Sequence, residues 1–158
     1  MPDVLFVCCG NTCRSPMAEC LFNALCGKRG LPWRAESAGL RVLEGDVATD
    51  GAFYEMRRRG LSLARHVAQP LSAMLIRGTR LVVAMGDSYA RMIRDRFPEA
   101  RVIAFNPPVP DPFGGPPAVY RATADNLEGR MAWVLAQLTA TPASNGGRPP
   151  AGPRGTVI

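Results

Sequence analysis

Short, largely apolar runs alternate along the chain with longer segments in which apolar residues recur every three or four positions. The segments of strand length are residues 4–7, 80–85 and 102–105, with WRAESA before Gly39 as a fourth candidate. The segments with helical periodicity are residues 16–26, 47–59, 87–97 and 118–138. Apolar strands separated by helices are typical of parallel sheets that are covered on both faces. The pattern therefore predicts an α/β fold, a three-layer sandwich with a central four-stranded parallel sheet flanked by helices.

The first predicted helix begins soon after the first strand. Its sequence PMAECLFNALC places Met17 and Leu21 on one face, and Pro16 suits the first helical position. Ser15 is expected to be the N-cap, because a serine hydroxyl can accept a hydrogen bond from the first turn. A strand, a short loop and the N-terminus of a helix therefore follow one another within residues 4–26.

The length and composition of the chain fit one domain. A chain of 158 residues with 47% apolar composition can bury a single core. Residues 1–140 are predicted to form this domain, because all the periodic segments fall within them. Residues 141–158 are rich in Pro and Gly, which bury little apolar surface, so they are predicted to be a disordered tail.

The net charge favours anionic partners. Eighteen arginines and one lysine stand against 13 acidic residues, which gives a net charge of +6. Without Arg148 and Arg154 of the predicted tail the charge is +4, so the predicted domain is only mildly basic. Because the arginines are scattered and are not interleaved with aromatic residues, a nucleic-acid-binding module is a distant alternative, and we expect no nucleic-acid partner.

The positions of the cysteines indicate reduced thiols. All five lie within the first 26 residues, at positions 8, 9, 13, 20 and 26. An odd number of clustered cysteines argues against the disulfide scaffold of a secreted protein. The sequence shows no basic region followed by a long apolar stretch at its start, and no later run of 18 apolar residues. We therefore expect a cytoplasmic protein without a membrane partner.

The sequence VLFVCCGNTCRSPMAE, residues 4–19, contains the main candidate for a functional site. Cys8 and Arg14 are separated by five residues, but about 0.6 such pairs are expected by chance, so this spacing alone is weak evidence. Their context is more informative, since a buried strand ends at Cys8 and a helix begins after Arg14. Gly10 and Asn11 permit positive φ angles in the turn between them. Backbone N–H groups and the helix dipole would then converge on one anion, as in a phosphate-binding loop.

The side chains of this loop predict phosphoryl transfer. A cysteine at a helix N-terminus beside an arginine is stabilised as its thiolate, so Cys8 would be nucleophilic toward phosphorus. The planar guanidinium of Arg14 can bind two phosphoryl oxygens at once. A thiolate cannot protonate the leaving group, so a separate acid is required. Asp111 in VPDPFGGPP can supply the proton, because its loop can lie at the same sheet edge as Cys8. A turn-shaping role for Asp111 also stays open.

The loop, the SAG motif at Ser37 and the DPFGG motif at Asp111 together resemble the low-molecular-weight protein tyrosine phosphatase family. The order and spacing of the motifs extend the resemblance over residues 3–138. It implies hydrolysis through a phosphocysteine on Cys8, with Arg14 binding the phosphoryl group and Asp111 acting first as the general acid and then as the base. It also implies no cofactor and no metal, with phosphorylated proteins as substrates and phosphate or other oxyanions as ligands of the loop.

The same resemblance implies supporting roles. Asn11 and Ser15 would hold the loop and the thiolate by hydrogen bonds, and Ser37 would brace Asn11. Cys13 stands where the family carries a second cysteine that can form a reversible disulfide with Cys8, which would make the enzyme redox-sensitive. The expected phosphate-binding and substrate-binding positions are Cys9, Gly10, Asn11, Thr12, Cys13, Ser15 and Phe113. Cys9 is included for its position in the loop alone.

Thr12 is the main position that discriminates between branches of this family, since bacterial tyrosine phosphatases can also carry glycine after the aromatic residue of the Asp-Pro motif. Tyrosine phosphatases commonly carry a bulky aliphatic residue at the position of Thr12 and two tyrosines after the Asp-Pro, where this chain has Phe113 and Gly114. Thr12 and DPFGG together resemble the protein arginine phosphatase branch, whose substrate is phosphoarginine. The hydroxyl of Thr12 adds a polar group beside the phosphoryl centre and removes aliphatic packing against a phenyl ring. We therefore expect phosphoarginine as the substrate, with phosphotyrosine as the alternative.

Other assignments have less support in the sequence. Arsenate reductases that share the loop relay oxidation to cysteines late in the chain, and this sequence has none after Cys26. A cysteine-rich metal-binding module would be expected to show paired Cys-x2-Cys spacing, which is lacking, and the single histidine, His66, is remote in sequence. His66 is expected to form structural hydrogen bonds. Asp87, the competing candidate for the acid, is expected to be a helix N-cap.

Overall fold

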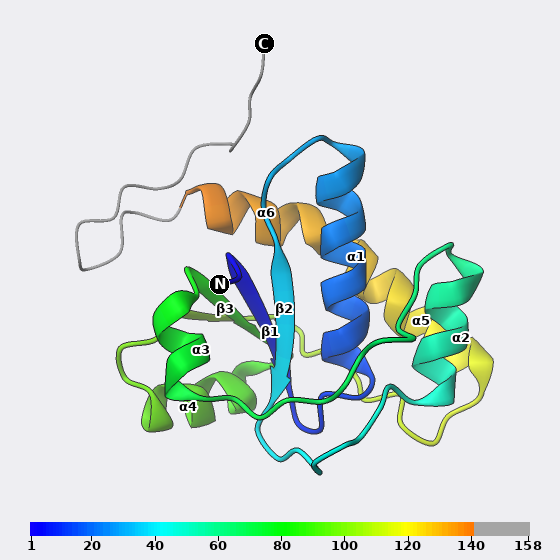
Figure 1. The fold of residues 1–158 in the computed structure, drawn as a ribbon, viewed down its shortest axis with the longest axis horizontal. Coiled ribbons are helices and arrows are strands. Elements are labelled where there is room, and N and C mark those ends of the chain that lie inside the picture. The colour runs from blue at the N-terminus through cyan, green and yellow to red at the C-terminus, as the bar shows by residue number, and fades with distance from the viewer. Residues whose placement is uncertain (141–158) are drawn as a thin grey trace.

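The computed structural model describes residues 1–140, and the tail expected at residues 141–158 lies outside the described residues. The strands are β1 (Val4–Cys8), β2 (Ala35–Gly39), β3 (Leu81–Ala84) and β4 (Val102–Ala104). They form one sheet in the order β2-β1-β3-β4, and every neighbouring pair is parallel (Figure 1). The predicted four-stranded parallel sheet is confirmed.

Helices cover both faces of this sheet (Figure 1). Among the described residues they are α1 (Arg14–Lys28), α2 (Asp50–Arg58), α3 (Ala73–Gly78), α4 (Asp87–Arg96), α5 (Pro117–Glu128) and α6 (Met131–Thr139). Side chains alternate along β1, so Val4 and Phe6 face one side of the sheet while Leu5 and Val7 face the other. The first pair is buried with residues of α1, α5 and α6, and the second with residues of α3 and α4. The three-layer sandwich is therefore confirmed.

Several helix boundaries differ from those expected. The last predicted helix is divided into α5 and α6, because the chain leaves α5 at Gly129 and Arg130. The helix expected from residue 47 starts at Asp50, with Thr49 as its N-cap. Gly86 stands at the N-cap of α4, so Asp87 is the first helical residue and the expectation for it was wrong. The short helix α3 was not anticipated, because six residues are too few to show a helical period.

Parallel strands end at one edge of a sheet, and the loops that follow them gather there. Cys8 ends β1 and Gly39 ends β2, while Asp111 follows β4. A Cβ atom at Gly39 would lie 2.6 Å from the carbonyl oxygen of Cys9, so the loop after β1 can pass this closely only beside a glycine. The backbone N–H of Leu40 also donates to the carbonyl oxygen of Cys8 at 3.1 Å. The residues predicted for the site are thus brought to this edge.

Candidate active site

Cys8 lies buried at the end of β1, beside the first turn of α1. Its sulfur is 2.9 Å from the hydroxyl oxygen of Ser15. The Ser15 oxygen accepts a hydrogen bond from Nδ2 of Asn11 at 2.8 Å, so the Ser15 proton is available to the sulfur. Ser15 is therefore not the N-cap that the sequence predicted. Cys13 occupies that position without a side-chain capping bond, because the Ser15 hydroxyl lies within the loop network.

Asn11 is the centre of the loop between β1 and α1. It is fully buried and has a φ of 58°, a left-handed conformation that asparagine tolerates. Its Nδ2 also donates to the hydroxyl of Ser37 at 2.9 Å, in agreement with the bracing role expected of Ser37. Its Oδ1 accepts from the backbone N–H of Gln69 at 2.9 Å, and its carbonyl oxygen contacts Nε2 of His66 at 2.7 Å. The sequence did not identify Gln69, and it predicted a hydrogen-bonding role for His66 without its partner.

A pocket of about 400 Å³ lies beside these supporting residues. Its lining consists of Glu19, Cys20, Glu36, Ser37, Ser62, Leu63, Arg65, His66, Val67 and Gln69. Burial raises the pKa of Glu19 to about 7, and the neighbouring Glu36 adds to this rise, while Arg34 and Ser37 oppose it. Burial lowers the pKa of His66, against the hydrogen bond to Asn11, so the neutral ring donates from Nε2 at neutral pH. Neither Cys8 nor Arg14 lines this pocket, so it is distinct from the part of the loop that contains these two residues.

Arg14, the first residue of α1, is buried with its guanidinium among groups from other loops. Its Nη1 donates to the carbonyl oxygen of Val109 at 3.1 Å. Its Nη2 lies 3.3 Å from the hydroxyl of Tyr89 and 3.6 Å from Oδ2 of Asp111. Burial acts to lower the pKa of Arg14, but the bond to Tyr89 and the charges of Cys8 and Asp111 raise it overall. Its buried Nε has no hydrogen-bond partner among residues 1–140.

Asp111 has the turn-shaping contact that the sequence left open and also lies beside Arg14. Its Oδ1 accepts the backbone N–H of Phe113 at 3.1 Å, which shapes the turn, while its Oδ2 is directed to Arg14. The side chain is 54% exposed, so Asp111 stands at the mouth of the site, where a leaving group would depart. Phe113 is 71% exposed and is linked to Asp111 through its backbone, with its ring in solvent. Gly114 follows with a φ of 78°, a conformation that favours glycine.

Cys13 is buried, and its sulfur contacts three hydroxyl groups. Its sulfur lies 3.3 Å from Oγ1 of Thr49 and 3.5 Å from the hydroxyl of Tyr120, with Oγ1 of Thr12 at 3.9 Å. Burial raises the pKa of Tyr120 to about 12, so this phenol keeps its proton at neutral pH. A Cβ atom at Gly51 would lie 2.2 Å from the ring of Tyr120, which shows how closely α2 and α5 approach. The sequence gave no sign of Thr49 or Tyr120.

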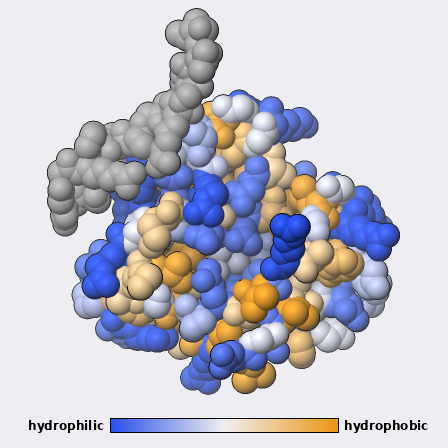
Figure 2. Space-filling model, viewed as in Figure 1, coloured by the Kyte–Doolittle hydropathy of each residue, from blue (hydrophilic) through white to orange (hydrophobic). Residues whose placement is uncertain are grey.

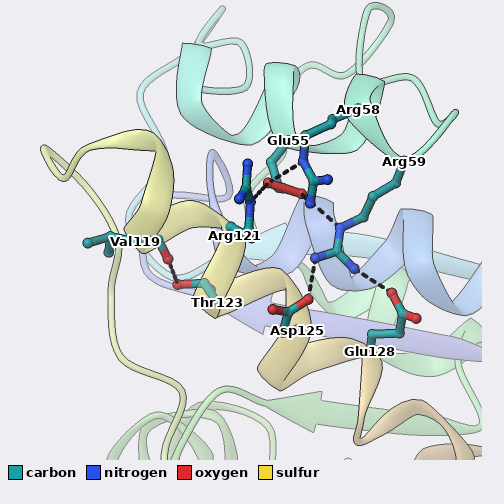
Figure 3. Close-up of polar contacts among 8 residues, drawn as sticks. All are labelled: Glu55, Arg58, Arg59, Val119, Arg121, Thr123, Asp125 and Glu128. Atoms are coloured by element: carbon teal, nitrogen blue, oxygen red, sulfur yellow. Dashed lines mark hydrogen bonds and ion pairs between the residues drawn. The ribbon is translucent and has the colours of Figure 1, made fainter.

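A cluster of ion pairs holds α2 against α5 (Figure 3). Glu55 of α2 is buried and accepts hydrogen bonds from Arg58 and Arg59 of 2.8 to 3.2 Å. Arg59 also pairs with Asp125 and Glu128 of α5. Burial acts to raise the pKa of Glu55, but the bonds from the two arginines lower it overall. The cluster thus links α2, which Thr49 caps, to α5, which contains Tyr120.

The remaining predicted loop residues have simpler surroundings. The carbonyl oxygen of Cys9 accepts the backbone N–H of Arg41 at 2.9 Å. Gly10 does not adopt a positive φ, so Asn11 alone provides the left-handed residue of this turn. Burial raises the pKa of Cys20 to about 12 and that of Cys26 to about 11, which keeps both thiols protonated. Within residues 1–140, no group of three His, Cys, Asp or Glu side chains is arranged to hold a metal ion.

Exposed apolar side chains lie on the loops that flank the loop between β1 and α1. Val47 and Val67 pair in an isolated antiparallel bridge, and both are exposed, as is Leu43. Figure 2 shows hydrophobic groups in the lower part of the face it presents, over the loops before and after α2. These loops are joined to the site, because the backbone N–H of Thr49 donates to the carbonyl oxygen of Thr12 at 3.0 Å. In the described part of the chain, no helix has the length and apolar character needed to span a membrane.

Known proteins share both this sequence and this fold. A protein-arginine-phosphatase of Bacillus subtilis (strain 168) is 35% identical over 145 residues, which are 86% of this chain and 96% of the relative. A crystal structure of a low molecular weight protein tyrosine phosphatase from T. tengcongensis has a TM-score of 0.82 at 36% identity, covering 87% of this chain and 99% of that one. A structure of the YwlE arginine phosphatase, a cysteine-to-serine mutant with a phosphorylated active-site serine, has the same TM-score at 33% identity, covering 87% and 96%.

A protein-family model also matches most of this chain. The model of the family described as "Low molecular weight phosphotyrosine protein phosphatase" matches residues 3–143. This match includes the loop at Cys8, the supporting residues Asn11 and Ser37, and the turn at Asp111. The chain therefore belongs to the low molecular weight phosphotyrosine protein phosphatase family.

Proposed function

We propose that this chain is a cysteine-dependent protein phosphatase that removes the phosphoryl group from phosphoarginine residues. The observation that carries this proposal is the juxtaposition at the edge of the sheet. The Cys8 sulfur has a hydroxyl donor at 2.9 Å, and the buried Arg14 guanidinium has a free Nε. A nucleophile and a fixed cation side by side match the needs of phosphoryl transfer, in which positioning and charge stabilisation dominate.

In the first step the Cys8 thiolate attacks phosphorus, and an S–P bond forms as the P–N bond of phosphoarginine breaks. The electron pair of that bond goes to the departing guanidine nitrogen, which takes a proton from the carboxyl group of Asp111. Arg14 holds two phosphoryl oxygens through Nε and Nη2, and the backbone N–H groups of the loop face the same anion. The product of this step is a phosphocysteine and a free arginine side chain.

In the second step water hydrolyses the phosphocysteine. The carboxylate of Asp111 takes a proton from the water, whose oxygen attacks phosphorus. The S–P bond breaks, and its electron pair returns to the sulfur of Cys8. The proton of Ser15 stabilises the restored thiolate, since Asn11 already donates to the Ser15 oxygen. Inorganic phosphate then leaves, and Asp111 is protonated for the next cycle.

The choice of phosphoarginine rests on Thr12. This side chain is half-buried in the loop, and its hydroxyl adds a polar group beside the phosphoryl centre in place of an aliphatic wall. Relatives named as arginine phosphatases cover most of this chain, which supports the same choice. Relatives and structures named as tyrosine phosphatases reach similar identity, so phosphotyrosine is the second candidate.

The surroundings of the site favour a protein as the substrate. Leu43, Val47 and Val67 expose apolar surface on loops bonded to the phosphate-binding loop, and the chain around a phosphorylated residue could cover them.

We place the activity in the cytoplasm, with residues 1–140 as the catalytic domain. We also propose that the reduced form is active and that oxidation to a Cys8–Cys13 disulfide would be reversible.

The test is kcat/KM for two peptides of matched sequence, one with phosphoarginine and one with phosphotyrosine, under reducing conditions with EDTA present. We expect a preference for phosphoarginine, and Thr12→Ile should shift the preference toward phosphotyrosine. Cys8→Ser is the control, because it should abolish turnover while phosphate still binds. If the wild type prefers phosphotyrosine, phosphotyrosine replaces phosphoarginine as the proposed substrate. Full activity of Cys8→Ser would overturn the mechanism.

A further inference from the structure

Tyr89 contacts the guanidinium of Arg14, although the two residues are 75 positions apart in the sequence. It lies in the first turn of α4, at the end of the sheet where β3 finishes, and is half-buried. Its hydroxyl is 3.3 Å from Nη2 of Arg14, and the guanidinium carbon is 5.3 Å from the centre of its ring. One side chain therefore offers Arg14 both a hydrogen bond and an aromatic ring that attracts a cation.

The three nitrogens of the guanidinium have different surroundings. Nη1 is occupied by the carbonyl oxygen of Val109, and Nη2 faces the hydroxyl of Tyr89. Nε has no partner within the described residues. Because Nη2 carries two hydrogens, it can donate one hydrogen bond to Tyr89 and a second to an oxyanion that Nε also binds. The Nε–Nη2 edge is therefore the edge that remains for a phosphoryl group.

We propose that Tyr89 is a positioning residue that fixes the orientation of the Arg14 guanidinium, so that its Nε–Nη2 edge faces the phosphoryl group. This inference rests on the proposed function, in which Arg14 binds that group. The bond from Val109 restrains only Nη1, and a second fixed contact on Nη2 is needed to set the plane. Asp111 cannot provide it, because its side chain is 54% exposed, lies 3.6 Å away and must be free for proton transfer.

The backbone around Tyr89 is built to bring both partners to Arg14. The N–H of Val109 donates to the carbonyl oxygen of Met85 at 2.9 Å, which joins the loop after β4 to the end of β3. A Cβ atom at Gly86 would lie 2.7 Å from Cβ of Pro108, so the two loops pack closely at this glycine. The Val109 carbonyl and the Tyr89 hydroxyl are thus held relative to each other, and the guanidinium lies against both.

The test compares Tyr89→Phe, which keeps the ring, with Tyr89→Leu, which removes both contacts. Tyr54→Phe is the matched control, because Tyr54 is exposed on α2. The readouts are the dissociation constant of inorganic phosphate by calorimetry, kcat/KM for p-nitrophenyl phosphate, and Tm. We expect phosphate binding and kcat/KM to fall about tenfold in Tyr89→Phe, because the lost hydrogen bond involves a charged group. In Tyr89→Leu, phosphate binding and kcat/KM should be lower still, by a further factor of about three or more, because the aromatic ring is lost as well.

The outcomes separate this inference from the proposed function. Unchanged phosphate affinity in Tyr89→Phe would overturn the role of Tyr89, whether or not Tm falls, while Cys8-dependent phosphatase activity would stand. Weaker phosphate binding in Tyr89→Phe without any hydrolysis of phosphopeptides by the wild type would support Tyr89 and overturn the proposed function. Tyr89→Phe keeps the ring and its packing, so this variant still tests the proposal if Tyr89→Leu loses stability.

Discussion

The hydroxyl oxygen of Ser15 lies 2.9 Å from the sulfur of Cys8 and already accepts a hydrogen bond from the Asn11 amide. The Ser15 proton is therefore left for the sulfur. A hydrogen bond to an anion is stronger than one to a neutral acceptor, so this contact suits a sulfur that carries negative charge during the reaction. The Asn11 amide is thus linked to the Cys8 sulfur through a single hydroxyl group.

Ser15→Ala should slow the alkylation of Cys8 by iodoacetamide at pH 7 about tenfold, because the thiolate loses a charge-assisted hydrogen bond. Tandem mass spectrometry that separates Cys8 from Cys9 and Cys13 gives the rate. Cys20→Ser is the control, because Cys20 lies outside the loop, and it should leave the Cys8 rate unchanged. An unchanged rate in Ser15→Ala would mean that the hydroxyl does not stabilise the thiolate.

Asp111→Asn should act mainly on substrates with poor leaving groups. We expect kcat/KM for phenyl phosphate to fall about 10²-fold or more, and that for p-nitrophenyl phosphate to fall less than about tenfold, because p-nitrophenolate leaves without a proton. Asp87→Asn is the matched control, because Asp87 is exposed at the start of α4 and should affect neither substrate. Equal losses for both substrates would argue against proton donation by Asp111.

Glu19→Gln should change the pH dependence of stability. The pKa of Glu19 is about 7 in the folded protein and about 4.5 when unfolded, so folding favours its protonated form. Its contribution to stability is present below pH 4.5 and is lost as the pH rises through 7. Glu19→Gln should therefore be more stable than the wild type by about 2 kcal/mol at pH 8, with little difference at pH 4.5. Urea unfolding at both pH values measures this, with exposed Glu44→Gln as the control; a gain that does not depend on pH would contradict the assignment.

Glu55→Gln should destabilise the contact between α2 and α5. Replacing the buried carboxylate leaves Arg58 and Arg59 without its charge, and we expect a loss of about 2 kcal/mol at pH 7. Because the pKa of Glu55 is lowered in the folded protein, its contribution is present above about pH 4.5 and is lost as the pH falls further. Urea unfolding should therefore show a smaller loss at pH 3.5. Arg121→Gln is the control, since this exposed arginine lies 3.8 Å from Glu55 and should cost less than about 0.5 kcal/mol.

The sequence predicted the parts of the site that are close together along the chain. Cys8 at the end of an apolar strand and Arg14 at the start of a helix could be placed because strand, turn and helix each leave a local pattern. The expectation for Ser15 was wrong for a related reason. A serine before Pro16 is usually a cap, but here its hydroxyl is engaged by Asn11 and Cys8, and only the folded loop reveals these partners.

The residues that the sequence missed reach the site from distant segments. Tyr89 lies on α4, Thr49 lies just before α2, and Tyr120 lies on α5. In the sequence each is only a polar or aromatic residue within an ordinary amphipathic segment. For Tyr89 a signal was available, because residues just after a parallel strand meet those after its neighbour. Thr49 and Tyr120 depend on the packing of α2 against α5, which no local pattern specifies.

The hydrogen bonds around Asn11 also have a consequence for inhibition of the enzyme by its product, inorganic phosphate. Ser15, Ser37, Gln69 and His66 hold the loop in shape through contacts within the protein, so the binding of a tetrahedral anion requires no folding of the loop. We expect the released phosphate to compete with the next substrate for the same place, so that the rate of dephosphorylation falls as free phosphate accumulates.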